Sequence, residues 1–158
     1  MDTERLIHGL QEARKHFTDM LSRTPDDKLE WKPDVPGGKP TSTLDIVRHC
    51  IAVDVEMKEY VTGEAEVDFD EADIEASFSS GPAAGVSERD GLLGILEETA
   101  RAVDAALAAV PDERWGEMLE LPFGSLSVEA FAWWLVAHWY YHAGQIAYLQ
   151  RCWGDLGM

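Results

Sequence analysis

The sequence predicts an all-α protein, a four-helix bundle with long connections between its helices. Apolar residues recur every three or four positions in four separate segments, which is typical of amphipathic helices. No segment alternates apolar and polar residues as a half-buried strand does, and capping residues mark where several helices begin. The chain has 158 residues, of which 46% are hydrophobic. This length suits a single domain over residues 1–158 with a core of its own.

The first helix is expected over about residues 2–22. Its apolar face consists of residues three and four positions apart, namely Leu6, Leu10, Ala13, Phe17 and Met20 or Leu21. Residues 23–40 contain four prolines and two glycines, so they should form a loop. The second helix should open at Ser42, whose spacing from Asp45 is that of a capping box, and end near Gly63.

The acidic stretch 64–85 should be a solvated connection, and it is the segment expected to move most. A capping pair of Ser87 and Asp90 should start the third helix, which Pro111 ends. After a further loop, the fourth helix is expected over about residues 127–152. Its middle is apolar on all sides, so loops or a second subunit should cover part of it.

The charge of the chain limits its partners. Lys and Arg number 13 against 30 Asp and Glu, a formal net charge of −17. Nucleic acids and anionic membrane surfaces are therefore not expected as partners, because both are bound through Lys and Arg. A small anionic substrate in a local pocket is not excluded by this argument.

A cytoplasmic location is expected. The N-terminal residues lack the basic and apolar regions of a signal peptide, and the fourth helix is too polar for a membrane span. Cys50 and Cys152 are far apart and form no C-x-x-C pair, so they predict a reducing compartment. Both are interpreted as small core residues rather than nucleophiles.

The residues that point to chemistry are His138 and His142. They lie four positions apart on one face of the fourth helix, close enough to share a metal ion. A third ligand is needed, and His49 is the candidate because its neighbours in the second helix are largely apolar. His8 and His16 fall on a more polar face of the first helix. The pattern leaves open the alternative that all three are core histidines bonded to the backbone.

Two stretches together resemble the DinB-like family, the DinB/YfiT-like metalloenzymes. One is LEWKP at 29–33 followed by STLDIVRH at 42–49, and the other is AHWYYHAGQIAYL at 137–149. The resemblance covers essentially the whole chain in helix order and spacing. It implies a four-helix bundle in which His49, His138 and His142 are the metal ligands.

Three neutral imidazoles would leave positions open on a divalent ion, which is the arrangement of catalytic rather than structural zinc. Zinc and nickel suit such ligands best, and iron is compatible with them. The resemblance implies two chemistries on a small-molecule substrate. One is hydrolysis, and the other is transfer or isomerisation that depends on a low-molecular-weight thiol.

Four further residues are candidates for the surroundings of this metal. Gln145, three positions after His142, could hold that ligand or a water molecule, and Trp134 could form an apolar pocket wall. Asp45 could support His49 instead of capping its helix. Glu56 shares the face of His49 and is a weak candidate for a general base, and no catalytic residue is assigned.

Three hypotheses follow for the function. The first is a metal-dependent enzyme, either a thiol-dependent S-transferase or a hydrolase. The second is a non-enzymatic bundle that binds a metal or a small molecule in a stress response, and the third is a structural dimer with core histidines. A homodimer is expected because the fourth helix carries more aromatic residues than one face can bury, namely Trp133, Trp134, Trp139, Tyr140 and Tyr141. Loops 23–40 and 111–126 are the alternative cover.

Overall fold

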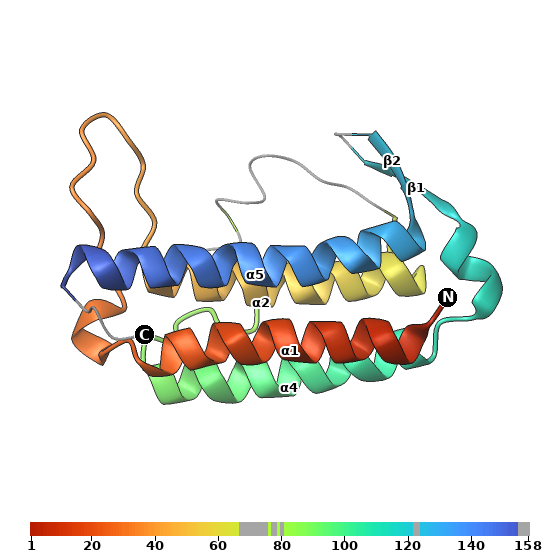
Figure 1. Ribbon diagram of the computed structural model, residues 1–158, viewed down its shortest axis with the longest axis horizontal. Coiled ribbons are helices and arrows are strands. Elements are labelled where there is room, and N and C mark those ends of the chain that lie inside the picture. The colour runs from red at the N-terminus through yellow and green to blue at the C-terminus, as the bar shows by residue number, and fades with distance from the viewer. Residues whose placement is uncertain (67–75, 77–78, 80, 122–123, 155–158) are drawn as a thin grey trace.

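The computed structural model describes residues 1–66, 76, 79, 81–121 and 124–154. Four long helices dominate this part of the chain (Figure 1). Their bounds are α1 (Thr3–Ser22), α2 (Thr43–Thr62), α4 (Arg89–Ala108) and α5 (Val128–Cys152). The predicted all-α four-helix bundle is thus confirmed. Most of the acidic stretch 64–85 lies outside the described residues.

The ends of α2 form as the sequence predicts. Ser42 accepts a hydrogen bond from the Asp45 amide, and Asp45 accepts one from the Ser42 amide, which completes the capping box. Gly63 ends the helix with a φ of 79°. A Cβ at this glycine would lie 2.9 Å from the guanidinium of Arg114. That guanidinium occupies the end of α2, where it donates to the carbonyl oxygen of Val61 at 2.6 Å.

The start of α4 differs from the prediction. Its N-cap is Glu88 rather than Ser87, and no side chain of the cap bonds to the helix. The amide of Arg89 instead donates to the carboxylate of Asp26 at 3.2 Å. This acceptor comes from a short 3-10 turn after α1, Asp26–Lys28. A local capping pattern was therefore the wrong signal, because a distant loop supplies the acceptor.

A hairpin precedes α5 where the sequence predicted only a loop. Strand β1 (Met118–Leu121) pairs antiparallel with β2 (Gly124–Ser127), and Leu119 lies opposite Leu126. Both leucines are half-buried and pack against the core. Strands of four residues are too short to show a clear alternation, and packing on the bundle stabilises a hairpin that would be marginal alone.

Each of the four helices packs mainly against two of the others. The main contacts join α1 to α4 and α5, and α2 to α4 and α5 (Figure 1). Helices α1 and α5 run parallel, because Gly9 adjoins Trp133 near their starts and Gln150 bonds to the carbonyl of Met20 near their ends. Helix α2 runs antiparallel to α5 (Figure 1). The beginning of α2 therefore faces the end of α5, and this brings His49 opposite His138 and His142 in the middle turns of α5.

A buried ionic network joins all four helices. The carboxylate of Asp54 accepts from Arg14 Nε at 3.1 Å, from Arg14 Nη2 at 2.8 Å and from Trp139 Nε1 at 2.9 Å. A further Arg14 nitrogen, Nη1, donates to Asp104 at 2.6 Å. Burial raises the pKa of Asp54, although Arg14 and Trp139 oppose this effect. Because Trp139 adjoins His138 in sequence, its bond to Asp54 also restrains the rotation of α5 at the histidines.

The cysteines and the aromatic residues of α5 differ in burial. Cys50 is buried as predicted, but Cys152 is exposed, so its assignment to the core was wrong. It lies in the last turn of α5, on the side that faces solvent. Trp139 is buried, whereas Tyr140, Tyr141 and Tyr148 are exposed. Within the described residues, no helix is both long enough and apolar enough to cross a membrane.

Candidate metal centre

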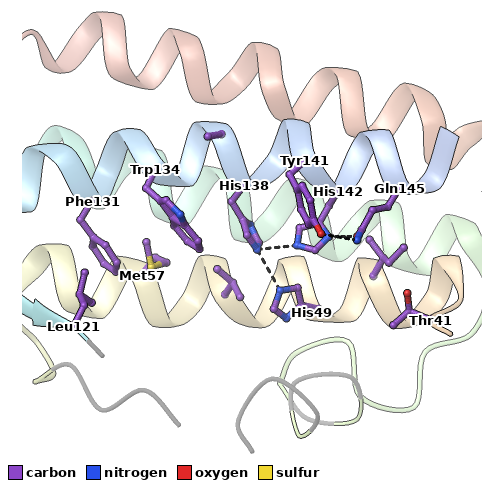
Figure 2. Close-up of a pocket in the computed structure, with 13 residues that line it drawn as sticks. Thr41, His49, Met57, Leu121, Phe131, Trp134, His138, Tyr141, His142 and Gln145 are labelled. Carbon is purple, nitrogen blue, oxygen red and sulfur yellow. Dashed lines mark hydrogen bonds between the residues drawn. The ribbon is translucent and has the colours of Figure 1, made fainter. Parts of the chain in front are cut away.

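Three buried histidines meet between α2 and α5. The Nε2 atom of His138 lies 3.2 Å from Nε2 of His49 and 3.0 Å from Nε2 of His142 (Figure 2). One ring nitrogen from each residue falls within 4.8 Å of the others. Helical spacing aligns His138 with His142, and the antiparallel packing of α2 brings His49 opposite both. The three predicted ligands are therefore brought together, while their binding of a metal stays a prediction.

The positions of these nitrogens suit a metal ion. A tetrahedral ion about 2.05 Å from two imidazoles would hold their nitrogens about 3.3 Å apart. The two separations that involve His138, 3.2 Å and 3.0 Å, are close to this value, and the nitrogens of His49 and His142 lie within 4.8 Å of each other. All three donors are imidazole nitrogens, which suit zinc, nickel, copper and iron.

Gln145 orients one of the three rings. Its Oε1 lies 2.7 Å from Nδ1 of His142, and its Nε2 donates to the hydroxyl of Tyr141 at 3.1 Å. With the amide in this orientation, Oε1 can only accept, so His142 carries its proton on Nδ1. The lone pair of Nε2 is then left facing His138, as a metal ligand requires. The structure thus places Gln145 against His142, while its support of a metal ligand stays a prediction.

The histidines are neutral at pH 7. Burial lowers the pKa of His49 from 6.5 to about 4, and repulsion from the positive charge that His142 carries when protonated adds to this effect. Burial, with contributions from both other histidines, lowers the pKa of His138 to about 2. Burial also lowers the pKa of His142, against the opposing hydrogen bond of Gln145. Neutral imidazole is the form that binds metal, so no proton must first be displaced at this pH.

The histidines open onto a cavity of about 610 Å³. Such a volume is within the usual range for sites of small molecules. Its polar lining is formed by Thr41, His49, His138, Tyr141, His142 and Gln145. Its apolar lining is formed by Ile46, Val53, Met57, Leu121, Phe131, Trp134 and Ala137. Trp134 lines the cavity, and its ring centroid lies 5.0 Å from that of His138, while its role beside a metal stays a prediction.

Two predicted supporting residues do not line this cavity. Asp45 is held at the start of α2 by its capping box and by Lys32, whose Nζ lies 2.7 Å from a carboxylate oxygen. The alternative role of Asp45, as a helix cap, is the one that the structure favours. Glu56 is half-buried on α2 and is not among the residues around the cavity. His8 and His16 are exposed on α1, as expected from its polar face.

Tyr141 is one of the cavity residues that the sequence analysis missed. It was interpreted as packing surface, but it lines the cavity and its hydroxyl accepts from Gln145. Tyr141 lies four positions before Gln145, so the same helical spacing that relates the two histidines also relates this pair. This spacing was the sequence signal that could have identified Tyr141 as a residue of the site.

Solved structures of low sequence identity share the fold of this chain. YfiT from Bacillus subtilis, described as a probable metal-dependent hydrolase with an unusual four-helix bundle topology, superimposes with a TM-score of 0.71. It is 21% identical, and the match covers 96% of this chain and 87% of YfiT. No curated protein matches the sequence.

Two further structures share the fold. A mycothiol-dependent maleylpyruvate isomerase has a TM-score of 0.72 and 11% identity, over 92% of this chain and 61% of the isomerase. The colibactin self-resistance protein ClbS, solved in complex with double-stranded DNA, has a TM-score of 0.71 and 12% identity, over 95% of this chain and 96% of ClbS. At these identities the structures establish the fold and not the activity.

The family is established by sequence. A sequence model of the DinB superfamily matches residues 9–146, which include all four helices in whole or in large part. This match agrees with the resemblance that the two quoted stretches carry. The chain therefore belongs to the DinB superfamily.

Proposed function

We propose that this protein is a metal-dependent enzyme in which His49, His138 and His142 hold one divalent ion beside a small-molecule pocket. The observation that carries the proposal is the meeting of three buried, neutral imidazoles at the wall of a cavity. Structural zinc sites usually close with four protein ligands, whereas three ligands are typical of catalytic sites. When bound, the ion would act as a Lewis acid that lowers the pKa of a coordinated water or thiol.

The side chains around the histidines have separate roles in this proposal. Gln145 keeps the proton of His142 on Nδ1, and Tyr141 accepts from Gln145, so its own hydroxyl proton is directed elsewhere. Trp134 lies beside His138 and helps to exclude water from one side of the cavity. These residues bind and orient, and none is proposed as the general base.

Hydrolysis of an ester or amide is the first candidate reaction. Water needs no recognition site of its own, and the described lining offers no cationic group that would select a particular acidic thiol. Thiol-dependent transfer is the second candidate, because the mycothiol-dependent isomerase has the same fold. Duplex DNA is not proposed as a partner, because the net charge of −17 would repel phosphates.

Metal analysis tests the site directly. Freshly purified protein should contain about one divalent ion per chain, and His142→Ala should bind it far more weakly. His8→Ala is the matched control, since His8 is exposed on α1 and should leave the metal content unchanged. Stoichiometric metal of unchanged affinity in His142→Ala would refute the site. The metal should also leave as the pH falls towards about 4, the lowered pKa of His49, because a protonated imidazole cannot bind metal.

Activity panels test the reaction. Ester and amide substrates are offered first without thiol, and electrophiles are then offered with a low-molecular-weight thiol. Turnover that needs metal but no thiol supports hydrolysis, and turnover that needs both supports transfer. Metal binding without turnover in either panel would favour a non-enzymatic metal-binding bundle.

A further inference from the structure

The cavity beside the histidines is polar at one end and apolar at the other. Leu121, Phe131, Met57 and Trp134 lie on one side of the three imidazoles, whereas Gln145 and Thr41 lie on the other (Figure 2). The apolar end is built from three elements, because α5, α2 and strand β1 each contribute to it. A molecule in the cavity would therefore meet two chemically different surfaces with the histidines between them.

The apolar end is aromatic and well packed. The rings of Phe131 and Trp134 are 6.2 Å apart and nearly parallel, with an interplanar angle of 8°. Trp134 in turn adjoins His138. This arrangement offers a continuous apolar wall that ends at an imidazole, so a planar or aliphatic group could pack there while its neighbouring atom reaches the histidines.

The charges of the cavity lining and of the whole chain give a second, independent constraint on the ligand. Among the described residues that line the cavity there is no lysine and no arginine. The chain as a whole carries −17, a field that disfavours the approach of anions. A carboxylate or phosphate placed at the apolar end would lose its hydration without gaining a cationic partner from these residues.

The polar end offers a hydroxyl donor. Because the hydroxyl of Tyr141 accepts from Gln145, its proton can be donated to a ligand. Tyr141 adjoins His142, with ring centroids 5.0 Å apart. A carbonyl oxygen is the simplest neutral acceptor for such a donor.

We propose that the substrate class of this pocket is a neutral, largely apolar organic molecule that carries one carbonyl, with its apolar part against Phe131 and Trp134 and its carbonyl beside the histidines and Tyr141. This inference rests on the proposed function in treating the bound molecule as the substrate. The choice between neutral and anionic ligands rests on the lining alone. A neutral ligand is a narrower class than the one that the net charge allowed, because the net charge did not exclude a small anionic substrate.

Binding of a graded series of probes tests the substrate class. The probes are neutral phenylalkyl methyl ketones of increasing chain length, each paired with its analogue that carries a carboxylate on the ring. Binding is measured by calorimetry on the full chain as purified and again after chelation, with circular dichroism to check the fold. Each added methylene should tighten binding by about fourfold until the cavity is filled. The carboxylates should bind at least tenfold more weakly in the chelated protein, where they have no ion to coordinate.

Two tryptophan variants locate the binding. Trp134→Ala should weaken binding of the longest ketone at least tenfold, whereas Trp133→Ala should leave it within twofold. Trp133 is the matched control, because it is also half-buried on α5 but contacts Gly9 of α1 and does not line the cavity. Equal or tighter binding of the carboxylates to the chelated protein, no effect of chain length, equal effects of the two variants, or no binding at all would overturn the inference. If the ketones bind as expected but the protein takes up no metal, the proposed function fails and the pocket's selectivity for neutral ligands stands.

Discussion

The hydrogen bond from His142 to Gln145 should set the metal affinity of this protein. Gln145→Leu removes the acceptor that lies 2.7 Å from Nδ1 of His142 and keeps the side chain near its original size. The ring then loses a partner for its N–H, which costs about 1–3 kcal/mol for a fully buried group, or about five- to 150-fold in affinity. Because Gln145 is half-buried, water can replace part of this bond. We therefore expect the metal to bind about tenfold more weakly.

The assay is competition for zinc against a chromophoric chelator at neutral pH. Gln145→Glu keeps an acceptor at this position, so it should bind zinc at least as tightly as the wild type. Gln11→Leu is the matched control, because the Gln11 side chain also donates a hydrogen bond to another side chain, that of Asp104 on α4, but lies outside the cavity. An affinity within twofold of wild type in Gln145→Leu, or an equal loss in Gln11→Leu, would refute the role of this hydrogen bond.

Four further outcomes are expected. Asp54→Ala should lower the free energy of unfolding by about 3–5 kcal/mol in urea titrations, because it leaves the buried Arg14 guanidinium with one carboxylate fewer; a loss below about 1 kcal/mol would contradict this. Removing metal should preserve the helical circular dichroism and lower the melting temperature, since the core does not depend on the ion, and collapse of the helical signal at room temperature would contradict this. In metal-free protein the folded pKa values of His49 and His138 lie below the ordinary 6.5, so the unfolded chain binds more protons between those values. Its free energy of unfolding should therefore fall as the pH drops from about 6.5 towards 4, by up to about 1.4 kcal/mol per pH unit for each imidazole, and a flat profile in urea titrations would contradict this. The protein should sediment as a homodimer through the exposed tyrosines of α5, and Tyr148→Glu should give monomers with unchanged metal content; a wild-type species near 17.6 kDa would retire the dimer.

The dimer prediction changes in one respect once the helices are packed. Trp133 is not available as interface surface in the way its sequence position indicated, because its ring lies 3.3 Å from where a Cβ on Gly9 would be. Trp139 is buried and bonded to Asp54. The aromatic excess on α5 is thus partly absorbed by α1 and by the cavity, and the exposed tyrosines are the part still without cover inside the described chain.

The positions of the helices could largely be predicted from the sequence, because apolar spacing and capping residues act within a few residues along the chain. The capping box of Ser42 and the glycine at position 63 bound α2 as expected, since both satisfy backbone groups within a few residues. The start of α4 and the β1–β2 hairpin were missed for the opposite reason. Asp26 caps α4 from across the chain, and the hairpin is stabilised by packing on the bundle.

The candidate site likewise has one part that local spacing predicted and another part that depends on the packing of the helices. Helical spacing alone aligned His138 with His142 and related Gln145 to His142, because residues three or four apart share a helical face. The contribution of His49 came from its apolar neighbours and from the family resemblance. Its distance of 3.2 Å to His138 depends on how α2 packs against α5, which no local pattern encodes.

The cavity and the proposed selectivity of its lining could be recognised only from the packing of the elements. Leu121, Met57 and Phe131 belong to three elements, and nothing in their sequence neighbourhoods shows that they face one space. The same holds for Asp54, Arg14 and Trp139, which meet in the interior from three helices. Helices and the i, i+4 pair are encoded over short distances along the chain. The position of His49 beside the other two histidines, the apolar end of the cavity and the buried ionic network depend on contacts between distant segments. In these contacts the burial of apolar surface decides which side chains meet.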